Sequence, residues 1–289
     1  MRRLRYVEFL AQILSRTAAA VILLALVAPV IAATIRDDFN DDWPYDATGI
    51  VPPGGIWTDG YNLGAGGPHD SNISAPGQLT TGLYDVGWES NTTNGPMQYV
   101  SWDSSVGFQA KVKISSQTQG FWSLSGLIVR SPKPLGTGDE SYVTIASFRP
   151  DPAPTDPESW QMTAPRDPDH APGGTPYDEN EIGGGGLTEA QVSYLMVSHV
   201  PGGPFVGRTS ADGINWLGRG TRDNPDLQSG MVEIGLFSGA LERDFGNVEP
   251  GAVTTWDWFE INMIPEPASL GLALVAVVMG GTVIRRRRR

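Results

Sequence analysis

The chain has 289 residues and a formal net charge of −12, from 20 basic and 32 acidic residues. The basic residues gather at the two ends, so residues 34–264 hold 11 basic and 30 acidic residues and carry a net charge of −19. A body this acidic repels phosphate backbones and argues against nucleic acid as a partner. The absence of cysteine excludes disulfides and thiolate metal sites.

Residues 1–33 have the pattern of a signal peptide. An apolar run from Ala18 to Val27 is followed by small residues at Val30-Ile31-Ala32, and we expect cleavage after Ala32 or Ala33. The alternative is an uncleaved anchor, which is disfavoured because the run is short and Pro29 interrupts its continuation. The positive residues of the signal are Arg2, Arg3, Arg5 and Arg16.

The body begins with the oxygen-rich segment Asp37-Asp38-Phe39-Asn40-Asp41-Asp42. Hard oxygen ligands suit calcium. Asp38 and Asp257 are the weak candidate pair for a structural calcium ion, since first and last strands often adjoin in a sandwich. A solvated acidic start to the first strand is the favoured alternative. No other cofactor is expected.

Residues 43–61 are rich in Gly, Pro and Asp and hold four aromatic rings. Sugars bind to flat aromatic faces with Asp and Asn beside them. The favoured alternative is that these rings cover the edge of a sandwich. Because basic residues are scarce in the body, a neutral sugar is the expected ligand. The carbohydrate-binding candidates are Trp43, Tyr45, Trp57, Asp59, Tyr61 and Asn62.

Short strands separated by turn residues dominate the remaining body. Apolar and polar residues alternate over Phe108–Ile114, which is typical of a strand with one wet face, and Gly126–Arg130 has the pattern of a more buried strand. Asp212-Gly213 favours the tight turn of a hairpin. Further strands are expected at 142–148, 192–199, 205–210, 231–238 and 254–262.

Residues 150–186 interrupt this pattern with eight prolines, six glycines and eight acidic residues in 37 positions. Such a segment cannot form a central strand or a helix. A disordered excursion and an ordered loop at the rim of a binding face are both compatible with it. We expect a mainly irregular insertion within one domain.

No catalytic residue is assigned from the sequence. A retaining glucanase needs two carboxylates about 5–5.5 Å apart. The nearest candidates are Asp257 and Glu260, but a spacing of three residues places them on opposite faces of a regular strand. The three histidines show no spacing that suggests zinc.

The C-terminal segment 263–289 combines three features. The tripeptide Pro265-Glu266-Pro267 is followed by an uncharged run of 17 residues at 268–284, which is near the lower limit for a membrane-spanning helix. A basic cluster closes the chain and would stay on the cytoplasmic side of a membrane. The residues of this cluster are Arg285, Arg286, Arg287, Arg288 and Arg289.

This tail resembles the PEP-CTERM class of exported bacterial proteins. The resemblance covers Ile264 to Arg289 and departs from the commonest pattern in having Ile264 rather than valine before the tripeptide. It implies a sorting signal processed by an exosortase, transient anchoring through the C-terminal helix, and a final location at the cell surface or in the extracellular matrix. An ordinary C-terminal anchor is the alternative.

The body, residues 34–262, resembles concanavalin A-like lectin and glucanase domains, most closely the C-terminal module of some bacterial β-xylosidases. The sharpest matches are Gly126–Arg130, Ser210–Trp216 and Val232–Phe237. The insertion 150–186 is a departure, as is the lack of a basic residue in 194–200. The resemblance implies an all-β fold, namely a two-sheet antiparallel β-sandwich with jelly-roll connections.

Together these features predict an exported, non-catalytic protein that binds an extracellular polysaccharide. Two alternatives belong to other classes: a glycoside hydrolase or lyase with an unrecognised site, and a purely structural matrix protein.

Overall fold

The computed structural model describes residues 34–44, 55–61, 68–82, 88–89, 92–93, 96–117, 123–132, 141–149, 158–163, 181–187, 193–240 and 253–264. The signal peptide and the C-terminal tail lie outside these ranges. Within the described part of the chain, no helix is long and apolar enough to cross a membrane. Residues 33–264 form one compact unit.

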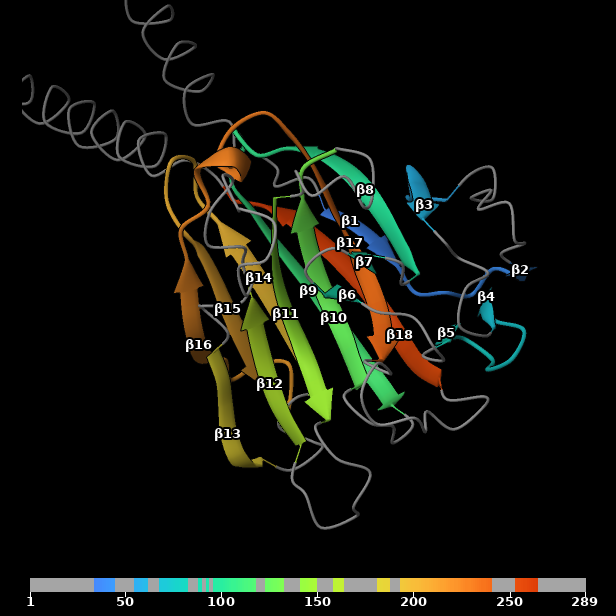
Figure 1. Cartoon of the computed structure of the whole chain (residues 1–289). Coiled ribbons are helices and arrows are strands. Elements are labelled where there is room, and N and C mark those ends of the chain that lie inside the picture. Colours follow the sequence, from blue (N-terminus) through green and yellow to red (C-terminus); the bar gives the residue numbers. More distant parts are fainter. Residues whose placement is uncertain are drawn as a thin grey trace, which may run out of the picture. The chain divides into compact units, whose positions relative to one another are not determined.

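Two antiparallel sheets make up the fold (Figure 1). In pairing order, sheet A contains β16 (Leu217–Arg222), β15 (Phe205–Ser210), β14 (Tyr194–His199), β9 (Phe108–Gln117), β18 (Val253–Met263), β5 (Leu79–Gly82), β4 (His69–Ser71) and β2 (Trp43–Pro44), and β1 (Thr34–Asp37) also pairs with β18. Sheet B contains β13 (Glu181–Leu187), β12 (Glu158–Thr163), β11 (Tyr142–Arg149), β10 (Ser123–Arg130), β17 (Met231–Ala240), β8 (Met97–Asp103) and β3 (Asp59–Tyr61). A separate ribbon pairs β6 (Trp88–Glu89) with β7 (Thr92–Thr93), and the 3-10 turn η2 covers Pro225–Leu227.

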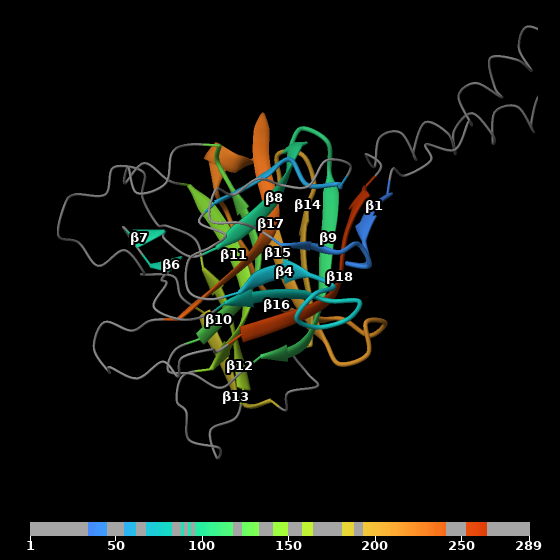
Figure 2. The same ribbon diagram turned by 90° about the vertical axis from the view of Figure 1, so that its right-hand side faces the viewer.

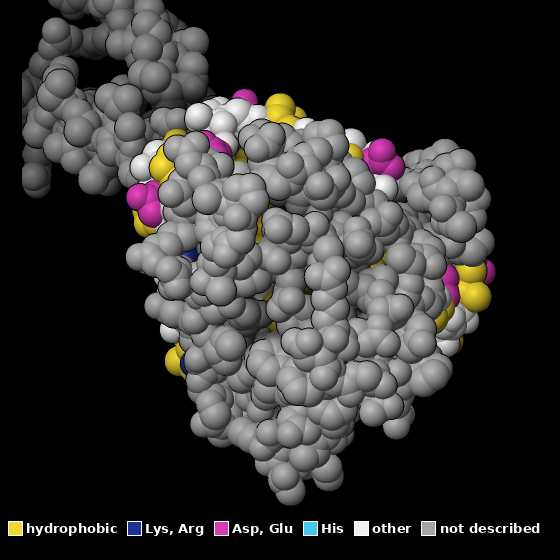
Figure 3. Space-filling view, in the orientation of Figure 1, with side chains coloured by type: hydrophobic (Ala, Val, Ile, Leu, Met, Phe, Trp, Pro, Cys, Tyr) yellow, Lys and Arg dark blue, Asp and Glu magenta, His cyan; other side chains and the backbone are white. Residues whose placement is uncertain are grey.

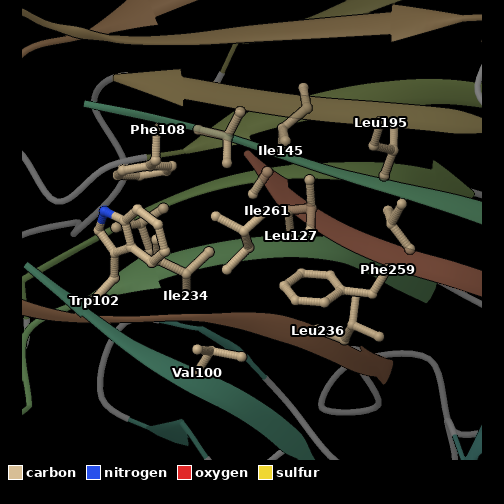
Figure 4. Close-up of a cluster of buried hydrophobic side chains, with 14 of the residues drawn as sticks. Val100, Trp102, Phe108, Leu127, Ile145, Leu195, Ile234, Leu236, Phe259 and Ile261 are labelled. Carbon is tan, nitrogen blue, oxygen red and sulfur yellow. The ribbon is translucent and has the colours of Figure 1, made fainter. Parts of the chain in front are cut away.

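The hydrophobic core lies between the sheets, which Figure 2 shows as two layers. The period-two pattern of β9 turns Phe108, Ala110 and Val112 inward, where each is fully buried. In Figure 4, Phe259 of β18 lies beside Leu236 of β17, so side chains from the two sheets meet. The expected all-β antiparallel sandwich is confirmed.

The insertion 150–186 is more ordered than its composition predicts. It contributes two strands to sheet B: β12 lies between β11 and β13, and β13 is the edge strand. The expectation of a mainly irregular loop without a central strand is therefore wrong for residues 158–163 and 181–186. Met162 of β12 is fully buried in the core, and Nη2 of Arg222 donates to its backbone oxygen at 3.0 Å.

The hairpin between β15 and β16 forms at the predicted turn. Gly213 has a φ of 72°, which glycine adopts without steric cost. The carboxylate of Asp212 accepts hydrogen bonds from the backbone nitrogens of Asn215 at 2.7 Å and Ile214 at 2.9 Å. These bonds hold the pKa of Asp212 well below its ordinary value. The turn is therefore stabilised by local interactions among its own residues.

Candidate functional site

Trp57, the central member of the predicted sugar-binding loop, is a core residue. Its side chain is 5% exposed and lies 4.7 Å, between ring centroids, from Phe259. On another side it stacks with Phe39, and its Nε1 donates to Oδ2 of Asp37 at 2.7 Å. A ring packed in this way has no free face for a sugar, which corrects the expectation for this residue.

The remaining residues of the predicted loop are described only in part. Trp43 and Tyr61 lie in β2 and β3, and the structure describes only their backbone. Tyr45 and Asn62 lie outside the described residues. Asp59 is exposed, and its Oδ1 accepts a hydrogen bond from the nitrogen of Gly60 at 2.8 Å. The sugar-binding role of these five residues stays a prediction.

Of the two calcium candidates, Asp257 lies in β18 and Asp38 directly follows β1, the strand that pairs with β18. Each carboxylate already accepts bonds from a basic side chain: Asp38 from Arg36 at 2.6 Å, and Asp257 from Lys113. Among the described residues, no three His, Asp or Glu side chains form a group suited to a metal ion. The calcium site stays a prediction.

A different surface emerges on the outer face of sheet A, the face turned away from sheet B. Strand pairing aligns side chains on this face in two rows that run across the strands. The first row contains Tyr194 of β14, Lys113 of β9 and Trp258 of β18. The second row contains Arg208, Met196, Lys111, Glu260 and Arg36, from β15, β14, β9, β18 and β1. We call these eight residues, with Asp257, the sheet-A face.

A β-bulge in β18 brings Asp257 onto the sheet-A face. The pairing register with β9 shifts between Trp256 and Trp258, so Asp257 is an extra residue beside Trp258. Asp257 pairs with Lys113, and Glu260 pairs with Lys111, two side chains of the same face of β9. The expectation that Asp257 and Glu260 take opposite faces is therefore wrong, because it assumed a regular strand.

Two half-buried aromatic rings form the centre of the sheet-A face. The ring centroids of Tyr194 and Trp258 are 6.2 Å apart, with an interplanar angle of 50°. The guanidinium carbon of Arg36 lies 4.7 Å from the Trp258 ring centroid, and Nζ of Lys113 lies 5.9 Å from that of Tyr194. Both distances are within the range of cation–π attraction. The rings are therefore held in place by cations on the same face.

Ion pairs link neighbouring strands within each row of side chains. Oε2 of Glu260 accepts from Nη1 of Arg36 at 3.2 Å, and its Oε1 lies 3.7 Å from Nζ of Lys111. Burial raises the pKa of Asp257, but bonds from Lys113, Ser115 and Gln78 outweigh this and leave it below its ordinary value. The bond to Asp257 raises the pKa of Lys113. Both groups are therefore charged at neutral pH.

The sequence predicted the strand of this face that carries Trp258 and Glu260. The alternation of Trp256, Trp258 and Glu260 predicts a strand, which is observed, but a regular alternation would have put the two tryptophans on one face. The bulge separates them: Trp256 is fully buried in the core, while Trp258 is half-buried outside. Tyr194 gave no signal, because its neighbours across the sheet come from residues distant in the chain.

The outer face of sheet B has a different character. Apolar side chains gather there in a second buried cluster, and next to them Nε of Arg130 lies 3.2 Å from Oε2 of Glu233. Both charged side chains are at most 5% exposed. The seven members of the cluster are Met97, Tyr99, Leu124, Ile128, Tyr142, Ala146 and Phe237.

No family model matches the chain, and no curated protein matches it. Its structure is similar to that of the κ-carrageenase from Pseudoalteromonas carrageenovora in complex with an oligotetrasaccharide of κ-carrageenan, with 13% identity over 82% of this chain and 97% of that one, and a TM-score of 0.42. It is also similar to an immunostimulatory antigen and pseudo β-1,3-glucanase of Mycobacterium tuberculosis (15% identity, 80% of this chain, 98% of that one, TM-score 0.44). A third similar structure is an alginate lyase mutant in complex with alginate trisaccharide (13% identity, 82% of this chain, 100% of that one, TM-score 0.45).

Proposed function

We propose that this chain is an exported, non-catalytic protein of the concanavalin A-like type, which binds a polysaccharide on the sheet-A face. The observation that carries the proposal is the pair of half-buried rings, Tyr194 and Trp258, bordered by charged hydrogen-bonding groups. Sugars pack their apolar faces on such rings and bond their hydroxyls to polar groups alongside.

The charge states on this face favour binding over catalysis. General acid–base chemistry needs a group whose pKa lies near the working pH. The shifts at Asp257 and Lys113 go the other way, toward a permanent carboxylate and a permanent ammonium. On the sheet-A face, Asp257 and Lys113 therefore suit a recognition role, in which they position hydroxyl groups.

The two ends of the chain support placement outside the cytoplasmic membrane. In this proposal the signal peptide is removed during export, and an exosortase processes the tail at Pro265-Glu266-Pro267, which leaves the body at the cell surface or in the matrix. The intact mass of the surface-exposed protein tests this step. Mature protein that still ends at Arg289 would instead support a plain membrane anchor.

Replacing Trp258 by Ala tests the binding proposal. Loss of one ring face should cost about 1–3 kcal/mol of binding free energy, so retention on a panel of immobilised polysaccharides should fall by at least about fivefold. The exchange Ile214→Ala is the matched control, because Ile214 is 80% exposed at the hairpin and lies off the face. Circular dichroism checks that both variants keep the β fold.

The outcomes separate the alternatives. Equal retention of the Trp258→Ala variant and the unchanged protein would move the binding site away from the sheet-A face. Release of reducing ends from a retained polysaccharide would show a hydrolase or lyase. Absence of retention on every polysaccharide would favour a structural matrix protein.

A further inference from the structure

The charge of the body is unevenly distributed. The segment 34–264 carries −19, yet four of its 11 basic residues lie on the sheet-A face: Arg36, Lys111, Lys113 and Arg208. In Figure 3, acidic side chains of the described residues are visible at opposite rims of another face of the molecule. The total charge predicted a neutral ligand, but it does not report where the basic groups lie.

Carboxylates neutralise only one side of this face. Asp257 pairs with Lys113, Glu260 is shared between Arg36 at 3.2 Å and Lys111 at 3.7 Å, and Asp38 also pairs with Arg36 at 2.6 Å. These carboxylates lie on β18 and directly after β1, at one side of the face. No described carboxylate forms an ion pair with Arg208 on β15, whose Nη1 donates to Oγ of Ser198 at 3.0 Å. The β9–β15 side of the face therefore has an excess of positive charge.

Arg208 and Lys111 are placed to contact neighbouring groups of one extended ligand. Both occupy the second row, on either side of Met196, so two inter-strand spacings separate their backbones, or about 10 Å. Met196 itself is 3% exposed. The first row, with Tyr194, runs next to them, which places sugar-stacking rings beside two cations.

We propose that the ligand of the sheet-A face is an acidic polysaccharide, whose carboxylate or sulfate groups contact Arg208 and Lys111 while its sugar rings contact Tyr194 and Trp258. This inference rests on the proposed function, since it names the ligand class of the same site. A guanidinium group offers paired donors that match either anionic group. At physiological ionic strength the Debye length is about 8 Å, so acidic residues farther away are screened.

The full-length chain in a mild detergent is tested for binding in 0.15 M salt to three probes: polygalacturonate, dextran sulfate and neutral laminarin. Tighter binding of either polyanion than of laminarin supports the proposal, and the two polyanions separate carboxylate from sulfate recognition. The variant Arg208→Gln should bind the preferred polyanion about tenfold more weakly, because it loses a charge-assisted hydrogen bond. Lys111→Gln should have the same direction of effect.

The matched control is Arg219→Gln. Its side chain donates to Oγ1 of Thr209, a residue in register with core-facing Leu195, so it removes the same charge away from the sheet-A face. Unchanged polyanion binding in both Arg208→Gln and Lys111→Gln, or an equal loss in Arg219→Gln, overturns the proposal. Binding of laminarin alone overturns it but leaves the proposed function intact. Absence of binding to all three probes, with the polysaccharide panel also negative, overturns both.

Discussion

The ion pairs on the two outer faces of the sandwich differ in their exposure to solvent. On sheet B, the ion pair of Arg130 and Glu233 is at most 5% exposed and adjoins a buried apolar cluster. On sheet A, the pairs around Glu260 and Asp257 are 19 to 38% exposed and surround two half-buried rings. Both faces come from the same alternation of residues in antiparallel strands.

The difference concerns what each ion pair contributes. A buried pair has lost its hydration, so each partner depends on the other, and removing one leaves an uncompensated charge. Water can hydrate each member of a solvent-exposed pair when its partner is removed, so such a pair contributes little to stability. Charges on the sheet-A face are therefore available for a ligand, whereas Arg130 and Glu233 are needed by the fold.

The largest expected effect comes from Glu233→Gln. The exchange removes the carboxylate that lies 3.2 Å from the buried Arg130 and should lower the free energy of unfolding by about 3–5 kcal/mol, measured by urea denaturation. The double variant Arg130→Met/Glu233→Leu is the control, because it removes both charges and should recover most of the loss. A loss below about 1 kcal/mol in the single variant would mean that the ion pairs of the two faces contribute equally little to stability.

Met162→Ala tests whether the insertion belongs to the sheet-B side of the core. Met162 is fully buried, so truncation should cost about 2–5 kcal/mol. For the same reason, replacing residues 152–184 by a short linker should destabilise the domain rather than leave it unchanged. A deletion variant with the urea midpoint of the parent chain would show that β12 contributes nothing to the core.

Mild acid should destabilise the fold through a histidine that is buried between the sheets. His69 of β4 contacts Oε1 of Gln98 of β8 at 3.0 Å, and burial lowers its pKa to about 4. An unfolded histidine binds its proton near pH 6.5, so below that pH the unfolded state binds more protons. Stability should therefore fall between pH 6.5 and about 4, by on the order of 3 kcal/mol.

The variant His69→Gln isolates this contribution. Its stability should depend less on pH over the same interval than that of the parent chain, as measured by urea unfolding at pH 7.5, 5.5 and 4.5. Burial also lowers the pKa of His199, so a smaller residual dependence is expected. An identical pH dependence in the parent and the variant would refute the role of His69.

Local patterns predicted the framework of the fold well. The alternation over Phe108–Ile114 and the Asp212-Gly213 turn depend on neighbours in the sequence, and both appear as predicted. The strand β12 was missed because its prolines and glycines lie around it rather than within it. The composition of a 37-residue window concealed a six-residue strand whose register with β11 is a tertiary property.

The candidate site was less predictable, because it depends on contacts between distant segments. Trp57 looks like a loop tryptophan until Asp37 and Phe259 are placed around it. Trp258 looks like a core residue until the bulge at Asp257 turns it outward. A bulge adds one residue to a strand without changing its composition, so period-two reasoning fails at this point.

The smallest expected effect comes from Glu260→Gln, the same chemical change as Glu233→Gln on the opposite face. The carboxylate of Glu260 is 19% exposed and is shared by Arg36 and Lys111, both of which water can solvate when the charge is removed. The free energy of unfolding should therefore change by no more than about 1 kcal/mol, and this change should shrink further in 1 M salt because screening weakens exposed pairs. The same exchange should strengthen polyanion binding. Removing the charge of Glu260 leaves Arg36 and Lys111 less neutralised, so a polyanion retained by the parent chain should be retained more strongly by the variant. A loss of stability as large as that of Glu233→Gln would show that the sheet-A face is part of the folding core, and its charges would then be no more available to a ligand than those of Arg130 and Glu233.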